Sequence, residues 1–356
     1  MAALATQLEA IAQLAQAKLQ QQESGLSVSL APSPVEPKKT YKTPMDKENQ
    51  SSVTELLLLG FPNVTGYKAV AFFIFILIVY ILTLMTNIMV IVLVSIKPQL
   101  HSPMYFFLQQ FSLVESILLT VIVPKMLHVV WLEGATISII GCITQTYIYC
   151  AIGCTECHLL TVMAYDRYLA ICNPLRYNVI MDLRLQHHMV VYCWVFGFLL
   201  TQITLALLCQ LEFCGPPVID HFFCDAIPFV DLSCSYKFAL KLEIMIISVP
   251  IIVIPFILVI MSYTCVCLAI FGISSATGRK KTFSTCSSHL AVVTMFYGTL
   301  ITIYTVPANG YTLPINKFIS FLYIVVTPLF NPIIYCLRNQ EMRVIMERIF
   351  RRRHKK

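Results

Sequence analysis

The chain has 356 residues, of which 58% are hydrophobic and only 12% carry a charge. Soluble domains carry roughly twice that share of charged residues, and so much apolar surface would aggregate in water. The composition therefore excludes an ordinary soluble domain. The net charge of +7 is concentrated near the end of the chain, so it indicates membrane topology rather than an acidic partner.

Residues 1–44 differ in composition from the rest of the chain. Apolar side chains recur there at helical spacing in an Ala/Gln-rich segment, and Ser/Pro-rich sequence follows. One interpretation is an extracellular helix that contacts another surface. The other, which the narrow alanine-rich stripe favours, is a disordered or weakly helical extension. Met45 would itself make an ordinary start.

Residues 45–67 form a short segment before the first apolar stretch and carry glycosylation sequons at Asn49 and Asn63. Asn49 is the better candidate, because Asn63 lies close to the membrane, where the glycosylation machinery reaches poorly. Residues 1–30 lack a basic segment followed by an apolar core. We therefore expect the first span to act as the signal anchor.

Seven apolar stretches follow, and each is close to the length of a tilted transmembrane helix. They run roughly over 68–95, 103–128, 137–164, 187–209, 239–263, 286–307 and 315–337. None alternates apolar and polar residues with period two, which argues against a β-barrel. Because a backbone in lipid must satisfy its own hydrogen bonds, residues 68–337 predict an all-α membrane protein, a seven-transmembrane helix bundle.

Basic residues gather in the loops on one side of this bundle. The 166–186 and 264–285 loops and the tail are basic, whereas the long 210–236 loop is net acidic. Basic loops stay in the cytoplasm. The pattern predicts a multi-pass plasma-membrane protein with an extracellular N-terminus and a cytoplasmic C-terminus.

The last segment, 338–356, predicts a short interfacial helix and a basic tail. Its apolar stripe consists of Met342, Ile345, Met346, Ile349 and Phe350. The basic residues on the opposite face are Arg343, Arg348 and Arg351. Such a helix lies on an anionic lipid leaflet. Membrane lipid is therefore an expected partner, and nucleic acid is not.

Five short strings, in order along residues 45–345, carry a family resemblance. They are Pro103–Leu108, Met163–Tyr177, Ser262-Tyr263, Lys281–Leu290 and Pro328–Asn339. Together they resemble the odorant (olfactory) receptors of the rhodopsin-like G-protein-coupled receptor superfamily. The Ser-Thr-Cys-Ser-Ser-His string at 284–289 is similar to the tetrapod-type class II group. Thr282 and Glu115 depart from the pattern, since Ala and Asp are more usual there.

The resemblance implies a receptor that binds small, mostly apolar volatile molecules and activates a stimulatory, olfactory-type heterotrimeric G protein, which raises cyclic AMP. The alternative is a rhodopsin-like receptor for a non-odorant small molecule. A light-sensing opsin would need a lysine within the seventh span, and Lys317 lies at its outer edge. An enzyme is not expected, because the chain has no His-Glu-x-x-His string and no glycine-rich phosphate loop.

Asp166 and Arg167 stand where the third span meets the cytoplasm. A charge pair at that depth is costly unless it is paired or solvated. It can lock a resting state, and its opening would free Arg167 for a partner. The alternative is a plain positive-inside anchor. Tyr263 and Tyr335, at the inner ends of the fifth and seventh spans, favour the switch. The full set of switch residues is Asp166, Arg167, Tyr168, Tyr263, Asn331, Pro332 and Tyr335.

Pro332 removes a helix hydrogen bond and can make a hinge beside Asn331. Glu115 and Glu156 are acids inside the second and third spans, where each must be neutral, paired or bound to an ion. The resemblance places them with Asn87 and Asn331 in a central polar cluster that could hold a structural sodium ion. Two protonated acids satisfied by hydrogen bonds are the alternative. No other cofactor is expected.

Cys142 lies at the outer end of the third span, and Cys214, Cys224 and Cys234 lie in the long outer loop, where conditions are oxidising. Four cysteines allow three pairings, and the residues alone do not choose between them. The resemblance implies Cys142–Cys224 and Cys214–Cys234, which would hold the loop over the mouth of the bundle. No metal site is expected.

The ligand is expected in the outer half of the bundle, because such receptors bind small molecules between helices. Tyr149, Cys150, Gly153, Cys154 and Cys157 share one stripe of the third span at helical spacing. The pocket positions that the resemblance implies on other spans are Ile247, Ser248, Ile251, Tyr297, Leu300, Tyr304, Phe321 and Ile324. Ordinary helix packing is the alternative for each residue. The predicted pocket is apolar, with scattered hydroxyls and thiols and no fixed charge, which suits a neutral volatile and disfavours amines.

Overall fold

The computed structural model divides the chain into two compact units, Met1–Ser52 and Val53–Lys356. It describes residues 54–211, 213, 216–233, 237–272, 275–305, 313–338, 342 and 344–345, all in the second unit. The predictions for residues 1–44, Asn49, Cys214, Cys234 and most of the tail helix lie outside the described residues. So do the side chains of Tyr304 and Tyr335.

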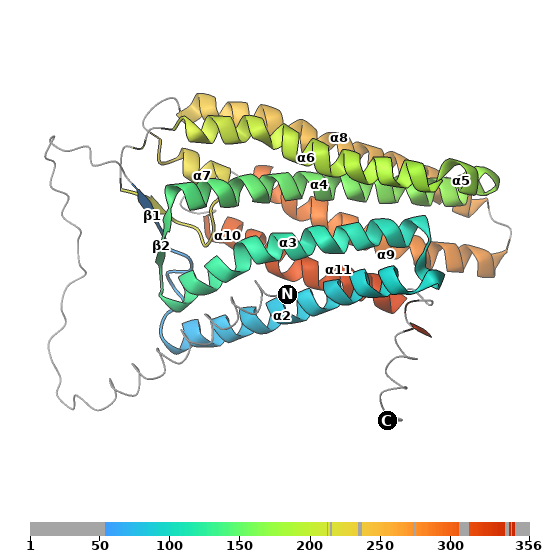
Figure 1. Ribbon diagram of the computed structural model, residues 1–356, viewed down its shortest axis with the longest axis horizontal. Coiled ribbons are helices and arrows are strands. Elements are labelled where there is room, and N and C mark those ends of the chain that lie inside the picture. Colours follow the sequence, from blue (N-terminus) through green and yellow to red (C-terminus); the bar gives the residue numbers. More distant parts are fainter. Residues whose placement is uncertain are drawn as a thin grey trace, which may run out of the picture. The chain divides into compact units, whose positions relative to one another are not determined.

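Seven long helical segments occupy the predicted spans (Figure 1). They are α2 (Tyr67–Ile96), α3 (Pro103–Trp131), α4 (Ile139–Cys172), α6 (Leu183–Cys209), α8 (Lys237–Phe271), α9 (Ala276–Thr305) and a composite seventh segment. Five of these helices are long and apolar enough to cross a membrane, and α9 contains a shorter apolar stretch, His289–Ile303. Several helices extend beyond the apolar stretch that predicts them, since polar residues continue the helix into the loops.

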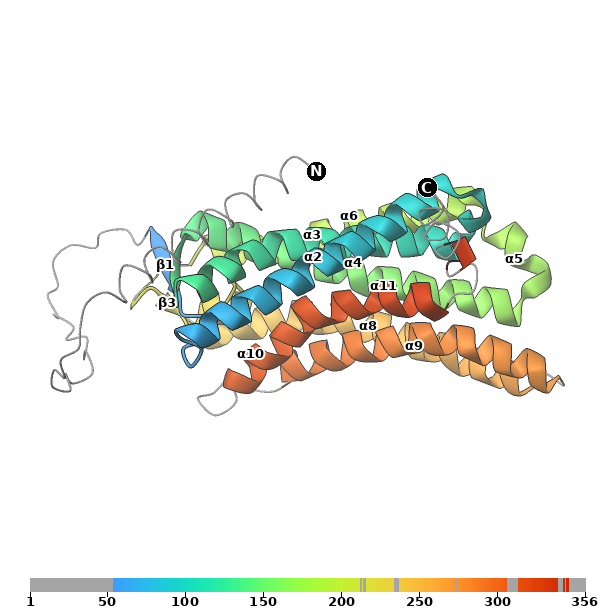
Figure 2. The ribbon, with the colours of Figure 1, turned by 90° about the horizontal axis from the view of Figure 1, so that it is seen from below.

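The seventh segment is not a uniform α-helix. It consists of α10 (Leu313–Phe321), a π-helical turn (Leu322–Val326) and α11 (Thr327–Arg338), which follow one another along α9 (Figure 2). The backbone amide and the hydroxyl of Thr327 both donate to the carbonyl of Leu322, five residues earlier. π-Turns are frequent at functional sites.

Local sequence explains where the central helices begin. Ser138 accepts a hydrogen bond from the amide of Gly141 at 3.1 Å and so caps α4. Asp182 caps α6 by accepting from the amide of Leu185 at 2.8 Å. Pro103 occupies the first turn of α3, where its missing N–H costs nothing.

Helix α4 forms the centre of the bundle. It packs against α3, α6 and α8 and also touches α9. In the most apolar 18-residue stretch of α4, 61% of the residues are buried, whereas only 17% are buried in the corresponding stretch of α8. The side chains that α2, α6 and α8 leave exposed are largely apolar, as expected for surfaces that face lipid. Residues that act inside the bundle are therefore concentrated on α4.

A small sheet covers one end of the bundle. Strand β1 (Glu55–Leu58) lies between β2 (Ala135–Ser138) and β3 (Val218–Ile219); it is antiparallel to β2 and parallel to β3. The short helix α7 (Ala226–Val230) lies at the same end. We call this the sheet end. The opposite end carries α5 (Pro174–Ile180), which has no buried residue, and we call it the α5 end.

Candidate ligand pocket and switch residues

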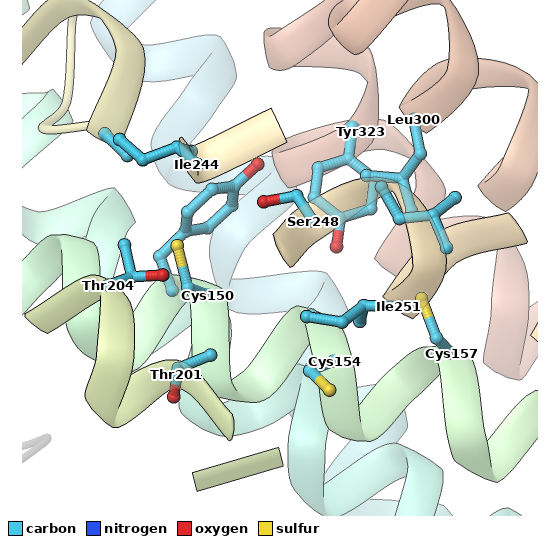
Figure 3. A pocket seen from close by; sticks show the side chains of 14 residues that line it. Cys150, Cys154, Cys157, Thr201, Thr204, Ile244, Ser248, Ile251, Leu300 and Tyr323 are labelled. Carbon is cyan, nitrogen blue, oxygen red and sulfur yellow. The ribbon is translucent and has the colours of Figure 1, made fainter. Parts of the chain in front are cut away.

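A cavity opens between α4, α6, α8, α9 and the seventh segment, in the half of the bundle nearer the sheet end. Its volume is about 60 Å³, against the roughly 10–15 Å³ that one water molecule needs on the same measure. Its lining consists of Tyr149, Cys150, Gly153, Cys154, Cys157, Thr201, Thr204, Ala226, Ile244, Ser248, Ile251, Ile252, Leu300 and Tyr323. Figure 3 shows the sulfurs of Cys150 and Cys157 on α4 directed toward the side of the cavity formed by Ser248 and Ile251 of α8.

Tyr323 connects this cavity to the interior of the bundle. It lies in the π-turn, lines the cavity, and donates a hydrogen bond of 2.9 Å to Glu156 on α4. Its ring packs edge-on against Tyr149 and Phe296. A group in the cavity can therefore act on Glu156 through one intervening side chain.

Glu156 belongs to the predicted polar cluster, and all four members are buried. The amide of Asn331 on α11 donates to Glu115 on α3. Within the described residues, the second oxygen of Glu115, the oxygen of Asn331 and both side-chain polar atoms of Asn87 have no hydrogen-bond partner. Buried polar atoms without a partner are rare and call for an explanation.

At the α5 end, Arg167 and Asp166 form an ion pair with a nitrogen–oxygen distance of 2.5 Å. The Asp166 side chain is 1% exposed and that of Arg167 15%. The other oxygen of Asp166 accepts from the hydroxyl of Tyr177 on α5 at 2.7 Å. Tyr263 on α8 bonds to the ring of His289 on α9. The pair and its neighbours thus tie α4 to α5 and α8 to α9.

The sequence is similar to those of known proteins over most of its length. A family model described as "Olfactory receptor" matches residues 76–353. Human olfactory receptor 11L1 is 44% identical over 309 residues, which are 87% of this chain and 96% of that relative. Human olfactory receptor 10A3 is 41% identical over 87% of this chain and 98% of its own length. Rat olfactory receptor 226 is 43% identical over 85% and 94%.

The chain belongs to the olfactory receptor family. Members of this family are G-protein-coupled receptors rather than enzymes. With its apolar helices, the receptor is a multi-pass membrane protein.

The receptor's cavity contains most of the residues that its sequence marks as pocket positions. These are Tyr149, Cys150, Gly153, Cys154, Cys157, Ser248, Ile251 and Leu300. Three others take part in packing. Tyr297 donates to the carbonyl of Cys157 at 3.2 Å, Phe321 packs against Phe61 and Phe72, and Ile324 is fully buried. Ile247, which is half-buried, also lies outside the lining.

Six cavity residues escape the sequence analysis for a common reason. They are Thr201 and Thr204 on α6, Ala226 on α7, Ile244 and Ile252 on α8, and Tyr323 on the seventh segment. A helix whose whole surface is apolar does not reveal which side faces inward. The acid Glu156, which Tyr323 contacts, is the signal in the sequence that could have pointed to it.

The loop between α6 and α8 covers the cavity, and we call its described part, residues 216–233, the lid. A disulfide joins Cys224 of the lid to Cys142 on α4, as predicted. The amide of Cys224 also donates to Gln145 at 2.9 Å. Asp225 caps α7 by accepting from Ala226 at 2.8 Å, and burial raises its pKa to about 6. An acid therefore lies within electrostatic range of Cys150, although the lining of the cavity itself contains no charged residue.

The lid is also tied to the start of the seventh segment. Lys317 donates to Asp220 at 2.5 Å and to the carbonyl of Gly60 at 3.0 Å. The ring of His221 is buried against Phe222 and Phe223, and its Nδ1 has no partner among the described residues. Burial, together with the Lys317 ammonium, lowers the pKa of His221 to about 3. The three His/Asp/Cys side chains at 221, 224 and 225 form no metal site, since Cys224 is in the disulfide.

Proposed function

We propose that the receptor binds small, mostly apolar volatile molecules in the cavity of the sheet end and activates a stimulatory heterotrimeric G protein at the α5 end. The observation that carries this proposal is the contact from Tyr323 in the cavity to Glu156 on α4. The same helix ends at the Asp166–Arg167 pair. One rigid element therefore links the site that a ligand can reach to the site that a partner can reach.

The cavity supports a neutral ligand. Its lining combines isoleucine, leucine and alanine with thiols and hydroxyls. Apolar pockets with a few polar groups are typical of small-molecule sites. The thiols are soft and polarisable and pack well against an apolar ligand.

The α5 end supports a G-protein interface. Breaking the Asp166–Arg167 pair would release a guanidinium that is otherwise largely covered. The α5 helix, which the pair holds through Tyr177, has no buried residue. A partner that binds the released Arg167 stabilises the open state. The size of that stabilisation equals the difference between the partner's binding free energies for the open and closed states.

The loop charges support an extracellular sheet end and a cytoplasmic α5 end. The α5 end carries Arg176 and Arg184, whereas the lid carries Asp220, Asp225 and Asp231. The disulfide fits an extracellular lid, because disulfides persist in oxidising surroundings.

The polar cluster also supports a bound sodium ion. The unpartnered atoms include oxygens from Glu115, Asn87 and Asn331, and hard cations prefer oxygen donors. Held there, a cation would supply positive charge to Glu115 and favour its ionised form. The unfolding temperature of the purified receptor should rise with sodium chloride more than with choline chloride, and Glu115→Gln should remove the difference.

The test of the proposed function is a cyclic AMP measurement on cells that express the full chain, with and without panels of volatile molecules. We expect a dose-dependent rise with at least one volatile and none in cells without the receptor. Nucleotide exchange on a stimulatory G protein in isolated membranes checks the coupling directly. A receptor that reaches the surface and exchanges no nucleotide with any volatile would refute the proposal.

A further inference from the structure

Two hydroxyls that line the cavity have no hydrogen-bond partner among the residues that the structure describes. They belong to Thr204 on α6 and Ser248 on α8, and no residue in the described part of the chain bonds to either one. Other polar groups in the lining are engaged. Thr201 donates to the carbonyl of Gly197 at 2.9 Å, and Tyr323 donates to Glu156.

These two hydroxyls point into the cavity. Figure 3 shows Thr204 and Ser248 on opposite walls, with their oxygens directed toward the space beside Cys150. A helical threonine commonly satisfies its hydroxyl with a carbonyl of its own helix, as Thr201 does one turn earlier. Thr204 and Ser248 do not, so their hydrogen-bonding capacity is directed at whatever occupies the cavity.

Another part of the wall, deeper in the bundle, is largely apolar. Ile251 on α8, Leu300 on α9 and Cys157 on α4 line that part of the cavity. The cavity thus has a hydroxyl-bearing side near the lid and an apolar side toward the α5 end. A ligand that matches both has one polar atom and an apolar body.

We propose that Thr204 and Ser248 are the specificity-determining hydrogen-bond donors of the site, and that it selects small neutral molecules carrying an acceptor oxygen. The inference deepens the proposed function and rests on it. The ligand oxygen, from a carbonyl or a hydroxyl group, accepts from Thr204, Ser248 or both, while its carbon chain packs on Ile251 and Leu300. A hydrocarbon of the same size leaves both donors unpaired and binds more weakly.

The nearby charges support a neutral ligand over an anion. Asp225 is buried in the lid within electrostatic range of Cys150. When ionised, its carboxylate disfavours an anionic ligand beside Cys150. Lys317 is engaged by Asp220 and Gly60 and is absent from the lining.

The experiment uses heptanal, 2-heptanone, 1-heptanol, heptylamine, heptanoate and heptane, which differ in the polar group at one chain length. Cyclic AMP responses are compared for the unchanged chain, Ser248→Ala and Thr204→Val, at matched surface expression. We expect each variant to lower the potency of an oxygenated probe about tenfold relative to heptane, which corresponds to about 1.4 kcal/mol. Comparing the aldehyde and ketone with the alcohol shows which oxygen the site prefers.

Thr201→Val is the matched comparison, because it makes the same change in the same wall but removes a hydroxyl that bonds to its own helix. Any effect of this variant should be equal for heptane and for the oxygenated probes. The inference is overturned if Ser248→Ala and Thr204→Val behave as Thr201→Val does, or if heptane matches the oxygenated probes on the unchanged chain. It is also overturned if heptylamine is preferred and loses its advantage only in Asp225→Asn.

Binding is read separately from signalling through the unfolding temperature of the purified receptor, which a bound probe raises. If oxygenated probes raise the unfolding temperature and Ser248→Ala removes that rise, the inference is supported. If the same receptor makes no cyclic AMP, only the proposed function is contradicted. Cyclic AMP responses without any dependence on ligand oxygen would leave the proposed function intact and overturn the inference. No shift with any probe overturns the inference as well.

Discussion

The two ends of the receptor are closed by different kinds of bond. At the sheet end, a disulfide, three paired strands and the Lys317–Asp220 ion pair hold the lid. At the α5 end, closure depends on Asp166, which binds Arg167 and Tyr177, and α5 buries no residue. The disulfide and the strand pairing keep one geometry at the sheet end, whereas a closure that rests on one carboxylate can be exchanged for a partner. The difference indicates that the sheet end preserves a binding site and the α5 end changes state.

Removing the disulfide should produce the largest effect, because it breaks the only covalent closure among the described residues. Loss of a native disulfide costs roughly 2–5 kcal/mol. We expect Cys142→Ser and Cys224→Ser to lower surface expression equally, and the double variant to be no worse than either. Surface labelling measures this, with Cys209→Ser, an exposed free cysteine, as the control. Clearly additive losses would contradict the comparison.

Removing Arg167 should silence the receptor without unfolding it. Arg167→Ala takes away the group that the open α5 end offers to the G protein, while the sheet end and its disulfide are untouched. We expect no cyclic AMP response at matched surface expression. The control is Lys241→Ala, which breaks an exposed ion pair with Asp231 at the sheet end and should respond normally. A normal response from Arg167→Ala would place G-protein contact elsewhere.

Tyr323→Phe should alter the communication between the ends while leaving both closures intact. The change keeps the ring that packs on Tyr149 and Phe296 but removes the bond to Glu156. Since that bond exists without ligand, we expect ligand-independent cyclic AMP to rise several-fold. Tyr147→Phe removes a hydroxyl from another face of α4 and serves as control. Equal basal signals in the two variants would refute the link.

Acid should weaken the lid through His221. The pKa of this ring is about 3 in the folded lid and about 6.5 when exposed. His221 therefore binds a proton more tightly when the lid is open than when it is closed. The stability that neutral His221 confers is full above pH 6.5 and falls as pH drops toward 3. At pH 5 the loss is about 2 kcal/mol. Between pH 6 and 3.8, Asp225 acts in the opposite sense, because its folded pKa is raised.

The measurement is the unfolding temperature of the purified receptor from pH 7.5 to 5, for the unchanged chain and His221→Phe. The variant keeps an aromatic ring beside Phe222 and Phe223 and cannot take up a proton. Asp220, Lys317 and Asp225 remain in both proteins, so the difference between the two curves isolates His221. If the two curves are parallel, protonation of His221 does not change the stability of the lid.

The sequence predicts the bundle well, because each span must be apolar whatever its neighbours are. The sheet escaped prediction since β1 pairs with strands far along the chain, and four residues such as Glu55–Leu58 carry little pattern of their own. In the seventh segment, Tyr323 of the π-turn lines the cavity, whereas Phe321 and Ile324 do not. An apolar helix does not show in its sequence which face is turned inward, and a local π-turn has no composition that would reveal it.

The smallest expected effect is that of removing residues 1–44. Strand β1 begins at Glu55, ten residues after Met45, so a chain that starts at Met45 keeps β1, β2, β3, the disulfide and the Lys317 contacts of the sheet end. The removed residues contain no cysteine and no sequon, and their narrow alanine-rich stripe offers little area for docking. We expect surface labelling and the odorant dose response to match those of the full chain. A loss of surface delivery, or a shift of the half-maximal dose by more than about tenfold (about 1.4 kcal/mol), would make the extension part of the working receptor.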